Sequence, residues 1–328
     1  MNIPRAENII KLMETFPYHI RPIDISKDAA EIAVLIRTGF RPWLDHVNLE
    51  YLNNLEKVGN DAKKNPFWTN LTGFPYSMSG VVCTDTSGTV IGTVSTSLFY
   101  LHERKCCLLT NVCVAPSHRK QGIASHMIEK IARLQSDAGT YGLYLQTRMA
   151  GTGLKDFYRK QGFTVTDFRE TWILPENKRI KLSSEIHIEP VPDSDKASFR
   201  RMFEHRYPET VLWNLDYPED LFQPGKIPDL LNRLFSPGRR FLRAIDSGGR
   251  TAAWAAFQNM NEGADMLWFI PNENMPDTSL SDALCSICAD YKGRKALKAD
   301  VPAGISGKIF QQAGFARQQT LAWMWRRL

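Results

Sequence analysis

Long apolar runs are missing from this sequence. Nowhere in its 328 residues do about 20 predominantly apolar residues follow one another, and the start MNIPRAENIIKLMETFPYHI has no unbroken apolar core behind a basic stretch. The sequence therefore indicates neither a membrane span nor a secretory signal. Cysteine is also scarce, since six cysteines in a chain of this length do not make a disulfide framework. We expect a reducing, cytoplasmic location and no membrane partner.

Compositional bias and a strong charge of one sign are lacking as well. The 21 glycines and 18 prolines are near average usage, which excludes collagen-like, fibrous and largely disordered chains. The formal net charge is +6, with 23 Lys and Arg against 18 Asp and Glu through Glu185 and 18 against 17 afterwards. This excess is well short of a dedicated nucleic-acid surface, so we expect no nucleic-acid partner. What remains is an ordinary globular composition with material for two domains.

A polar stretch near the middle of the chain has the composition of a linker. Residues 175–185, PENKRIKLSSE, lie between the strand-like runs WIL and IHIEPV. We therefore predict one domain over residues 1–178 and another over residues 185–328. The stretch from Phe40 to Ser79 is rich in aromatic residues and has no counterpart of similar length in the second half. It is the part of the first domain where we expect a substrate wall or lid.

The two halves of the chain resemble each other in pattern. VVCTDTSGTVIGTV and LRAIDSGGRTAAWA both place an Asp-Ser-Gly type of turn between extended segments. LYLQTRMAGTGLKDFYRKQGF aligns without a gap on ALKADVPAGISGKIFQQAGF, and 17 positions separate Leu145 from Gly162 as they separate Leu297 from Gly314. Each half is predicted as strand, helices, three-stranded meander, helix, strand, helix, strand. The expected fold class is α+β, with a mixed, mostly antiparallel sheet flanked by helices in each half.

The segment LLTNVCVAPSHRKQGIASHMIEKIARL, residues 108–134, predicts a strand, a loop and a helix. The apolar strand ends at Pro116, which has no N–H to donate, and an apolar stripe with helical spacing follows from Ile123. Such a loop directs unpaired backbone N–H groups and the positive end of the helix dipole at a phosphate. Gly122 allows close approach, and Arg119 and Lys120 add positive charge. We therefore expect a phosphate site here.

The run V-x-V-A-P-x-H-R-x-Q-G-I-A resembles the acetyl-CoA signature of the GNAT superfamily of N-acetyltransferases. Arg119, Gly122 and Ala124 match its pattern of Arg or Gln, two residues, Gly, one residue, then Gly or Ala. The resemblance implies acetyl-CoA as co-substrate, with the preceding strand splayed from its neighbour and paired with the pantetheine amides. The cofactor-binding residues that it implies are Val112, Cys113 and Val114 on the strand, then Arg119, Lys120, Gln121, Gly122, Ile123, Ala124 and Ser125 at the pyrophosphate.

A tyrosine four residues before a Gly-Phe pair is the second feature of this family, and here it is Tyr158 in FYRKQGF. A phenol held at the thiol can supply a proton as the C–S bond breaks, so we predict Tyr158 as the general acid. The alternative is that Tyr158 only packs beside Phe157 and Phe163. One departure from the family is Gly151, which stands where an Asn often opens the last helix.

The expected reaction is direct attack of a neutral primary amine on the acetyl thioester in a ternary complex. The developing oxyanion needs a fixed N–H, which the strand near Val114 can offer. The general base stays open among a water relay, Asp45 and Glu50, because the strand CCLLTNVCV holds no carboxylate and Glu103 is expected as an exposed turn acid. The acceptor is also open, and a small-molecule amine is expected.

The second half lacks both motifs. Phe310 stands at the position equivalent to Tyr158, and WFIPNENMPDTSLSDAL contains no Arg-x-x-Gly-x-Ala. The resemblance therefore implies two tandem GNAT-like domains, a catalytic one over residues 1–178 and a degenerate one over residues 185–328 that supports the cleft or a homodimer. The alternative function is a non-catalytic acyl-CoA-binding sensor or interaction protein.

Three further signals do not indicate a site of their own. Cys285-x-x-Cys288 lacks a second ligand pair at zinc spacing and is expected on the buried face of a helix, so we predict no metal. Cys113 lies on the cofactor strand without an evident His-Asp relay, which favours direct transfer over an acyl-enzyme. His118 and His126 are read as ordinary histidines at a helix start.

Overall fold

The computed structural model describes most of the chain and divides it into two compact units. It describes residues 16–41, 44, 46–64, 78–149, 153–176, 180, 185–207, 209–212, 215, 240–260, 263–291, 295–302 and 307–328. The first unit comprises Met1–Leu145 and Trp325–Leu328, and the second comprises Gln146–Met324. These units are groups of residues that contact one another more than they contact the rest of the chain. The domain ranges 1–178 and 185–328 remain a prediction. Each unit is an α+β fold with a mostly antiparallel sheet, which confirms the predicted fold class.

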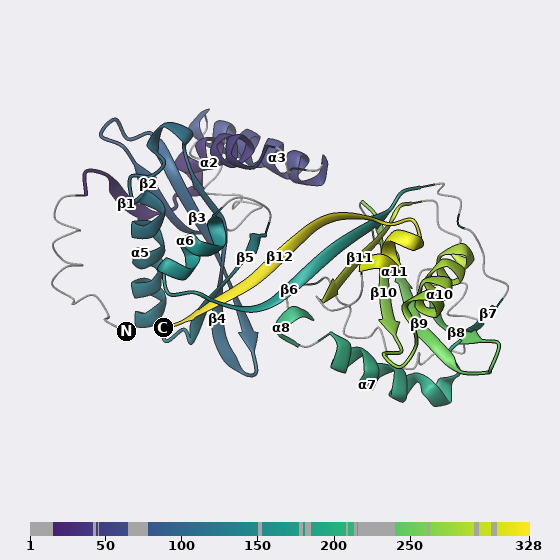
Figure 1. Ribbon diagram of the computed structural model, residues 1–328. Helices are drawn as coiled ribbons and strands as arrows, with labels where there is room; N and C mark the ends of the chain where they lie inside the picture. Colours follow the sequence, from purple (N-terminus) through teal and green to yellow (C-terminus); the bar gives the residue numbers. More distant parts are fainter. Residues whose placement is uncertain are drawn as a thin grey trace. The chain divides into compact units, whose positions relative to one another are not determined.

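The first unit is built on the strand order β1-β2-β3-β4-β5, followed by the end of β12 (Figure 1). Pairing is antiparallel from β1 to β4 and parallel between β4 and β5. Its elements are β1 (His19–Pro22), α2 (Ile25–Phe40), α3 (His46–Lys64), β2 (Ser79–Thr84), β3 (Val90–Leu101), β4 (Arg104–Val114), the short 3-10 helix η2 (Pro116–His118), α5 (Ile123–Asp137) and β5 (Gly142–Arg148), whose last residues belong to the second unit.

Helices cover both faces of the first sheet. Cys113 of β4 lies opposite Thr93, and its Sγ donates to the carbonyl oxygen of Leu35 in α2 at 3.4 Å. One residue along β3, Gly92 faces α5, because a Cβ there would meet the side chains of Met127 and Ile123. Since successive strand residues face opposite sides of a sheet, α2 and α5 lie on opposite faces. The strand predicted at the start of residues 108–134 therefore lies between two helical layers.

The second unit repeats this pattern with the strand order β12-β6-β11-β10-β9-β8-β7. Trp268 and Phe203 lie in a core cluster under α7, while Phe269 and Phe310 lie in a cluster under α10 and α11. Its elements are α6 (Leu154–Lys160), β6 (Thr164–Leu174), β7 (Ile186–Pro190), η3 (Asp193–Asp195), α7 (Lys196–Arg206), α8 (Glu209–Leu212), β8 (Arg240–Asp246), β9 (Thr251–Gln258), β10 (Asp265–Pro271), α10 (Asp277–Asp290), β11 (Leu297–Pro302), α11 (Gly307–Gln312) and β12 (Ala316–Arg327).

Both predicted hairpins have the same turn chemistry. Asp85 Oδ1 accepts hydrogen bonds from the N–H groups of Ser87 and Thr89 at 2.9 and 3.0 Å, between β2 and β3. Asp246 Oδ1 accepts from Gly248 and Arg250 at 3.0 and 2.8 Å, between β8 and β9. These hydrogen bonds replace ladder bonds where each chain reverses. The repeat seen in the sequence is thus a repeat of structure.

The final strands of the two halves are exchanged. β6 follows α6 directly in the chain, yet it pairs antiparallel with β11, from Leu174 opposite Leu297 to Arg169 opposite Pro302. The end of β12 belongs to the first unit, where the N–H of Leu328 donates to the carbonyl oxygen of Tyr141 at 3.2 Å. Each unit therefore contains a strand from the other half of the chain.

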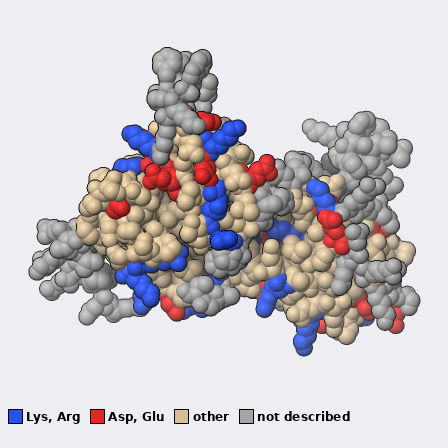
Figure 2. Space-filling model, turned by 90° about the horizontal axis from the view of Figure 1, so that it is seen from above, with Lys and Arg blue, Asp and Glu red and all other residues tan. Residues whose placement is uncertain are grey.

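Charged side chains of both signs are mixed on the face that Figure 2 shows, and neither sign covers a large continuous area there. This distribution fits the modest net charge of +6. Within the described ranges, no helix is long and apolar enough to cross a membrane.

Candidate active site

A bulge shapes the end of β4. The register with β3 shifts between Thr93 and Ser95, and Asn111 on the opposite strand has φ of 51°. Asn adopts this left-handed conformation more readily than most residues, and its Nδ2 donates to Ser95 Oγ at 3.2 Å. The bulge is not among the features predicted from the sequence. An Asn inside an otherwise apolar strand is the signal that indicates it.

Beyond the bulge, β4 presents a backbone donor at its free edge. The parallel pairing with β5 ends at Leu109 opposite Leu145, whereas β4 continues to Val114. The N–H of Ala115 donates to the carbonyl oxygen of Ile91 at 2.8 Å, toward β3. Because backbone N–H groups of successive strand residues alternate in direction, the N–H of Val114 is directed away from β3. It is therefore directed to the edge where the pairing with β5 has ended.

The loop between β4 and α5 collects backbone N–H groups. Lys120 has φ of 62° and Gly122 has φ of 79°, and α5 begins at Ile123 without a side-chain cap. No acceptor for the N–H groups of residues 120–125 is found within the described part of the chain. Unpaired amides in a left-handed turn at a helix N-terminus form a concave anion site, and the helix dipole adds to it. The arrangement suits a pyrophosphate.

Side chains hold this loop in place. Arg119 is exposed, and its Nε donates to the carbonyl oxygen of Val114 at 3.1 Å. Gln121 accepts from the hydroxyl of Tyr18 and donates through Nε2 to the carbonyl oxygen of Ser117 at 3.3 Å. Lys120 is exposed beside them. The loop therefore has cationic side chains at a prearranged turn, and its contact with Tyr18 is not among the features predicted from the sequence.

The two histidines of the loop make structural contacts. His118 Nδ1 lies 2.9 Å from Ser117 Oγ, and the edge of the Tyr18 ring packs near His118. His126 Nδ1 lies 3.0 Å from the carbonyl oxygen of Gly122, and its ring stacks on Phe16 at 4.0 Å between centroids.

Tyr158 is a buried residue of α6. It is 6% exposed, and its ring makes edge contacts with Phe157 and Phe163 at 5.0 and 5.9 Å between centroids. The packing that the sequence offered as an alternative is therefore present. The loop at Gly122 belongs to the first compact unit and Tyr158 to the second. The role of Tyr158 as an acid stays a prediction.

Cys113 has the environment of an inert thiol. It is 6% exposed, and burial raises the pKa of its thiol to about 11. A Cβ added to Gly39 of α2 would lie 2.3 Å from its Sγ, so the helix packs directly against the sulfur. A cysteine nucleophile must be a thiolate that can reach its substrate. These contacts disfavour an acyl-enzyme on Cys113.

The structure describes Glu103 and Glu50 among the carboxylates considered as general base, but it does not describe Asp45. Glu103 is exposed in the turn before β4 with φ of 62°, so the whole strand separates it from the loop after Val114, roughly 30 Å at about 3.3 Å per residue. Glu50 is exposed on α3. Asp45 lies outside the described residues, as do Gly151 and the aromatic residues Trp43, Phe67, Trp68, Phe74 and Tyr76 of the expected lid.

The second unit has different residues at the matching positions. Phe310 is fully buried and stacks on Trp172 of β6 at 5.3 Å between centroids. Cys285 and Cys288 are buried on α10, as predicted, and burial raises the pKa of both thiols. Among the residues described, no group of three or more His, Cys, Asp or Glu side chains is placed to hold a metal ion.

Comparison with known proteins identifies the domain that carries this loop. Residues 45–163 match the model of the Acetyltransferase (GNAT) family. The chain carries a GNAT acetyltransferase domain. The matched range includes β4, the loop, α5 and Tyr158. No curated protein matches this chain significantly.

Solved structures share the GNAT fold over nearly the whole chain. A GCN5-related N-acetyltransferase from Sphaerobacter thermophilus has a TM-score of 0.56 at 13% identity, covering 95% of this chain and 96% of that one. The glucosamine N-acetyltransferase region of a fungal multi-domain GH3 β-N-acetylglucosaminidase has a TM-score of 0.57 at 10% identity, covering 94% of this chain and 38% of that one. The first match spans both proteins almost completely, so the shared fold extends beyond the GNAT domain into the second half.

Proposed function

We propose that this protein is an acetyl-CoA-dependent N-acetyltransferase that moves an acetyl group to a primary amine by direct attack in a ternary complex. The observation that carries the proposal is the set of unpaired amides at residues 120–125, which lies at the start of α5 within the GNAT domain. These amides, with Arg119 and Lys120 beside them, fit the pyrophosphate of acetyl-CoA. Bound there, the cofactor supplies an acetyl thioester.

The residues of β4 then have defined tasks in the proposed reaction. Val112, Cys113 and Val114 line the edge along which the pantetheine arm would pair, and the N–H of Val114 is directed to that edge. A backbone donor at a fixed position stabilises the oxyanion that forms when the amine attacks the thioester carbon. The buried thiol of Cys113 takes no covalent part, so the acetyl group passes directly to the amine.

Proton transfer completes the proposed reaction. The amine nitrogen forms the new C–N bond and gives its proton to a base, either water or a carboxylate such as Glu50 or Asp45. As the C–S bond breaks, the phenol of Tyr158 gives its proton to the leaving thiolate. No metal is required in this scheme, and we expect a small-molecule amine as acceptor.

The proposed acid is tested by Tyr158→Phe, assayed by thiol release from acetyl-CoA over a panel of primary amines. We expect the variant to bind acetyl-CoA as the wild type does and to lose turnover by about 10²-fold or more, the usual contribution of a general acid. Tyr100→Phe is the matched control, since Tyr100 is 70% exposed in the β3–β4 hairpin. Unchanged turnover in Tyr158→Phe would remove the assigned acid.

A non-catalytic acyl-CoA-binding sensor is the second candidate, and the burial of Tyr158 between Phe157 and Phe163 favours it. In that case the tyrosine only packs, and the N–H groups of residues 120–125 serve binding alone. The same assay separates the two functions. Tight binding of acetyl-CoA without thiol release for any amine would support the sensor. Steep salt dependence of binding to nucleic acid would instead support a nucleic-acid binder.

A further inference from the structure

The second unit contains a cavity of about 500 Å³ between α7 and the end of β10. One wall is a single face of α7, where Ser198, Arg201, Met202, His205 and Arg206 follow one another at helical spacing. The opposite wall is formed by β9, by the end of β10 and by the turn that follows it. This volume lies within the usual range for sites that bind small organic molecules.

The cavity lies beside α7, whose Phe199 and Phe203 pack against β10 on the buried side of the helix. In the first unit, α2 packs so closely near the end of β4 that a Cβ on Gly39 would lie 2.3 Å from Cys113 Sγ. In the second unit, α7 ends at Arg206, and Ile270 at the end of β10 lines the cavity. The cavity thus lies in the half of the chain that lacks the phosphate loop and the tyrosine.

The charge on the α7 wall indicates an anionic ligand. Arg206 is 17% exposed, its Nη1 donates to Glu273 Oε1 at 3.3 Å, and its buried Nε has no hydrogen-bond partner within the described ranges. Arg201 and His205 are exposed at the rim. Glu273 is 64% exposed and offsets only part of this charge. Because Nε is buried, a carboxylate in the cavity would meet the Nη groups of this guanidinium and pair with its positive charge.

The remaining lining indicates an apolar body attached to that anion. Trp254 and Met202 border the cavity, and Ile270 forms part of the core cluster below it. An indole face and aliphatic carbons gain from contact with a flat or branched hydrocarbon, whereas an inorganic anion would leave them wet. A lining that combines positive charge with apolar side chains therefore favours an organic acid over free phosphate.

We propose that this cavity binds a small organic carboxylate with an aromatic or branched apolar body, its carboxylate on Arg206 and its body against Trp254. The site is independent of acetyl transfer in the GNAT domain. Glu273 competes with the ligand for Arg206, so this residue limits the affinity. The turn that carries Glu273 begins at Asn272, whose Nδ2 donates to the carbonyl oxygen of Thr251 at 2.8 Å.

Isothermal titration of the full chain with 2-naphthoate tests the ligand class. We expect one molecule to bind per chain, the neutral 2-naphthamide to bind about tenfold more weakly or worse, and inorganic phosphate not to displace the acid at equal concentration, since about 1.4 kcal/mol separates each tenfold step. Equal affinity for acid and amide, displacement by phosphate, or no binding of the acid at 5 mM would overturn the proposal.

Substitutions of charged residues test whether 2-naphthoate binds in this cavity. Arg206→Ala is expected to weaken 2-naphthoate by about tenfold or more, and Glu273→Gln to strengthen it about two- to fivefold, because the competing carboxylate is gone. Arg200→Ala and Glu204→Gln are matched controls, since these residues form an exposed ion pair on the same helix away from the cavity. Glu273→Gln removes no packing, so its result stands even where Arg206→Ala unfolds. Weaker binding in Glu273→Gln, or equal losses in Arg200→Ala and Arg206→Ala, would contradict the site.

Discussion

Gly122 is the residue on which the geometry of the phosphate loop depends. Its φ of 79° lies in the left-handed region, and a Cβ there would lie 3.4 Å from His126 Nδ1. An L side chain is strained at this φ, so the turn would open and redirect the neighbouring N–H groups. Burial alone does not explain the glycine, because the position is exposed. It is the N–H groups around it that need this turn.

Gly122→Ala should therefore weaken acetyl-CoA by about tenfold, which corresponds to about 1.4 kcal/mol, in an equilibrium binding measurement. Gly88→Ala is the matched control, because Gly88 has φ of 84° in the β2–β3 turn with nothing near its Cβ. Both variants carry the same backbone strain, and only the first touches the loop. Equal losses of affinity would mean that the measurement reports backbone strain and not the loss of the N–H groups that bind the phosphate.

Cys113 gives a second prediction at the scale of the residue. Its pKa in the folded protein, about 11, is above the ordinary value of 9.0, so burial favours the neutral thiol. The stability contributed by this neutral thiol is present below pH 9 and is lost as pH rises from 9 to 11. At pH 8, iodoacetamide should leave Cys113 unmodified in folded protein and modify it in guanidinium, as site-resolved mass spectrometry would show. Acetyl-Cys113 formed from acetyl-CoA would contradict direct transfer.

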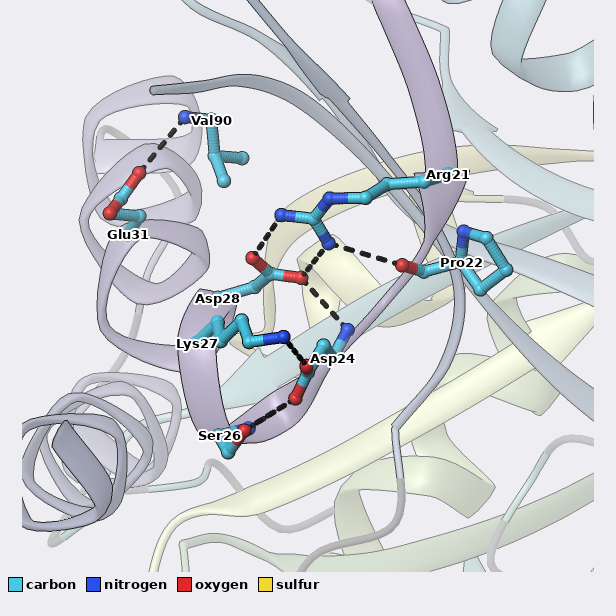
Figure 3. A network of polar contacts seen from close by, with 8 residues as sticks. All are labelled: Arg21, Pro22, Asp24, Ser26, Lys27, Asp28, Glu31 and Val90. Carbon is cyan, nitrogen blue, oxygen red and sulfur yellow. Dashed lines mark hydrogen bonds and ion pairs between the residues drawn. The ribbon is translucent and has the colours of Figure 1, made fainter. Parts of the chain in front are cut away.

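At the scale of the element, a buried ion pair joins β1 to the start of α2 (Figure 3). Arg21 donates through Nη1 and Nη2 to Asp28 at 2.6 and 2.7 Å, and Asp28 also accepts from the N–H of Asp24 at 2.8 Å. Asp28 is 2% exposed, whereas Arg21 is 30% exposed. The pair raises the pKa of Arg21 through its hydrogen bond to Asp28. These bonds set the position of α2, which in turn covers the end of β4.

Asp28→Asn should destabilise the first unit by about 2–4 kcal/mol, because it leaves a partly buried guanidinium without its charged partner. Chemical denaturation followed by circular dichroism measures this change. Lys27→Ala is the control, since the Lys27–Asp24 pair lies at the surface with Lys27 74% exposed, and its loss should cost at most about 0.5 kcal/mol. If the two variants lose equal stability, the buried pair is not the cause.

At the scale of the whole molecule, the strand exchange makes the two halves depend on each other. Trp325 stacks on Tyr141 at 5.8 Å between centroids, and Arg326 forms an ion pair with Glu129 of α5. These contacts lie in the first unit although the residues end the second half of the chain. The first unit therefore includes residues 325–328, which come from the second half of the chain.

A chain that ends at Met324 should lose about 2–4 °C or more in the melting temperature of its first transition, because roughly 1 kcal/mol or more of packing is removed. Differential scanning calorimetry of the full-length and shortened chains measures it. Arg133→Ala is the control, as Arg133 is exposed on α5. Residues 1–178 expressed alone should likewise be less stable than the same residues in the whole chain. An unchanged transition in the shortened chain would contradict the exchange.

Much of the local structure depends on residues that are close together in the sequence. The sequence by itself therefore determined it. The Asp85 and Asp246 turns, the end of β4 before Pro116 and the apolar stripe of α5 depend on hydrogen bonds and periodicity within about ten residues. The resemblance to GNAT enzymes rests on two stretches of this kind, one around Gly122 and one around Tyr158. Patterns of this length are visible in a sequence because their causes lie within it.

Only the tertiary structure decided which strands pair across long distances in the chain. The partner of β6 is β11 and the end of β12 lies beside Tyr141, although nothing in the composition of either strand distinguishes these pairings from pairings within one half. The inert surroundings of Cys113 likewise arise from how closely α2 approaches the sheet. That approach depends on side chains from several elements at once, so no single stretch of sequence encodes it.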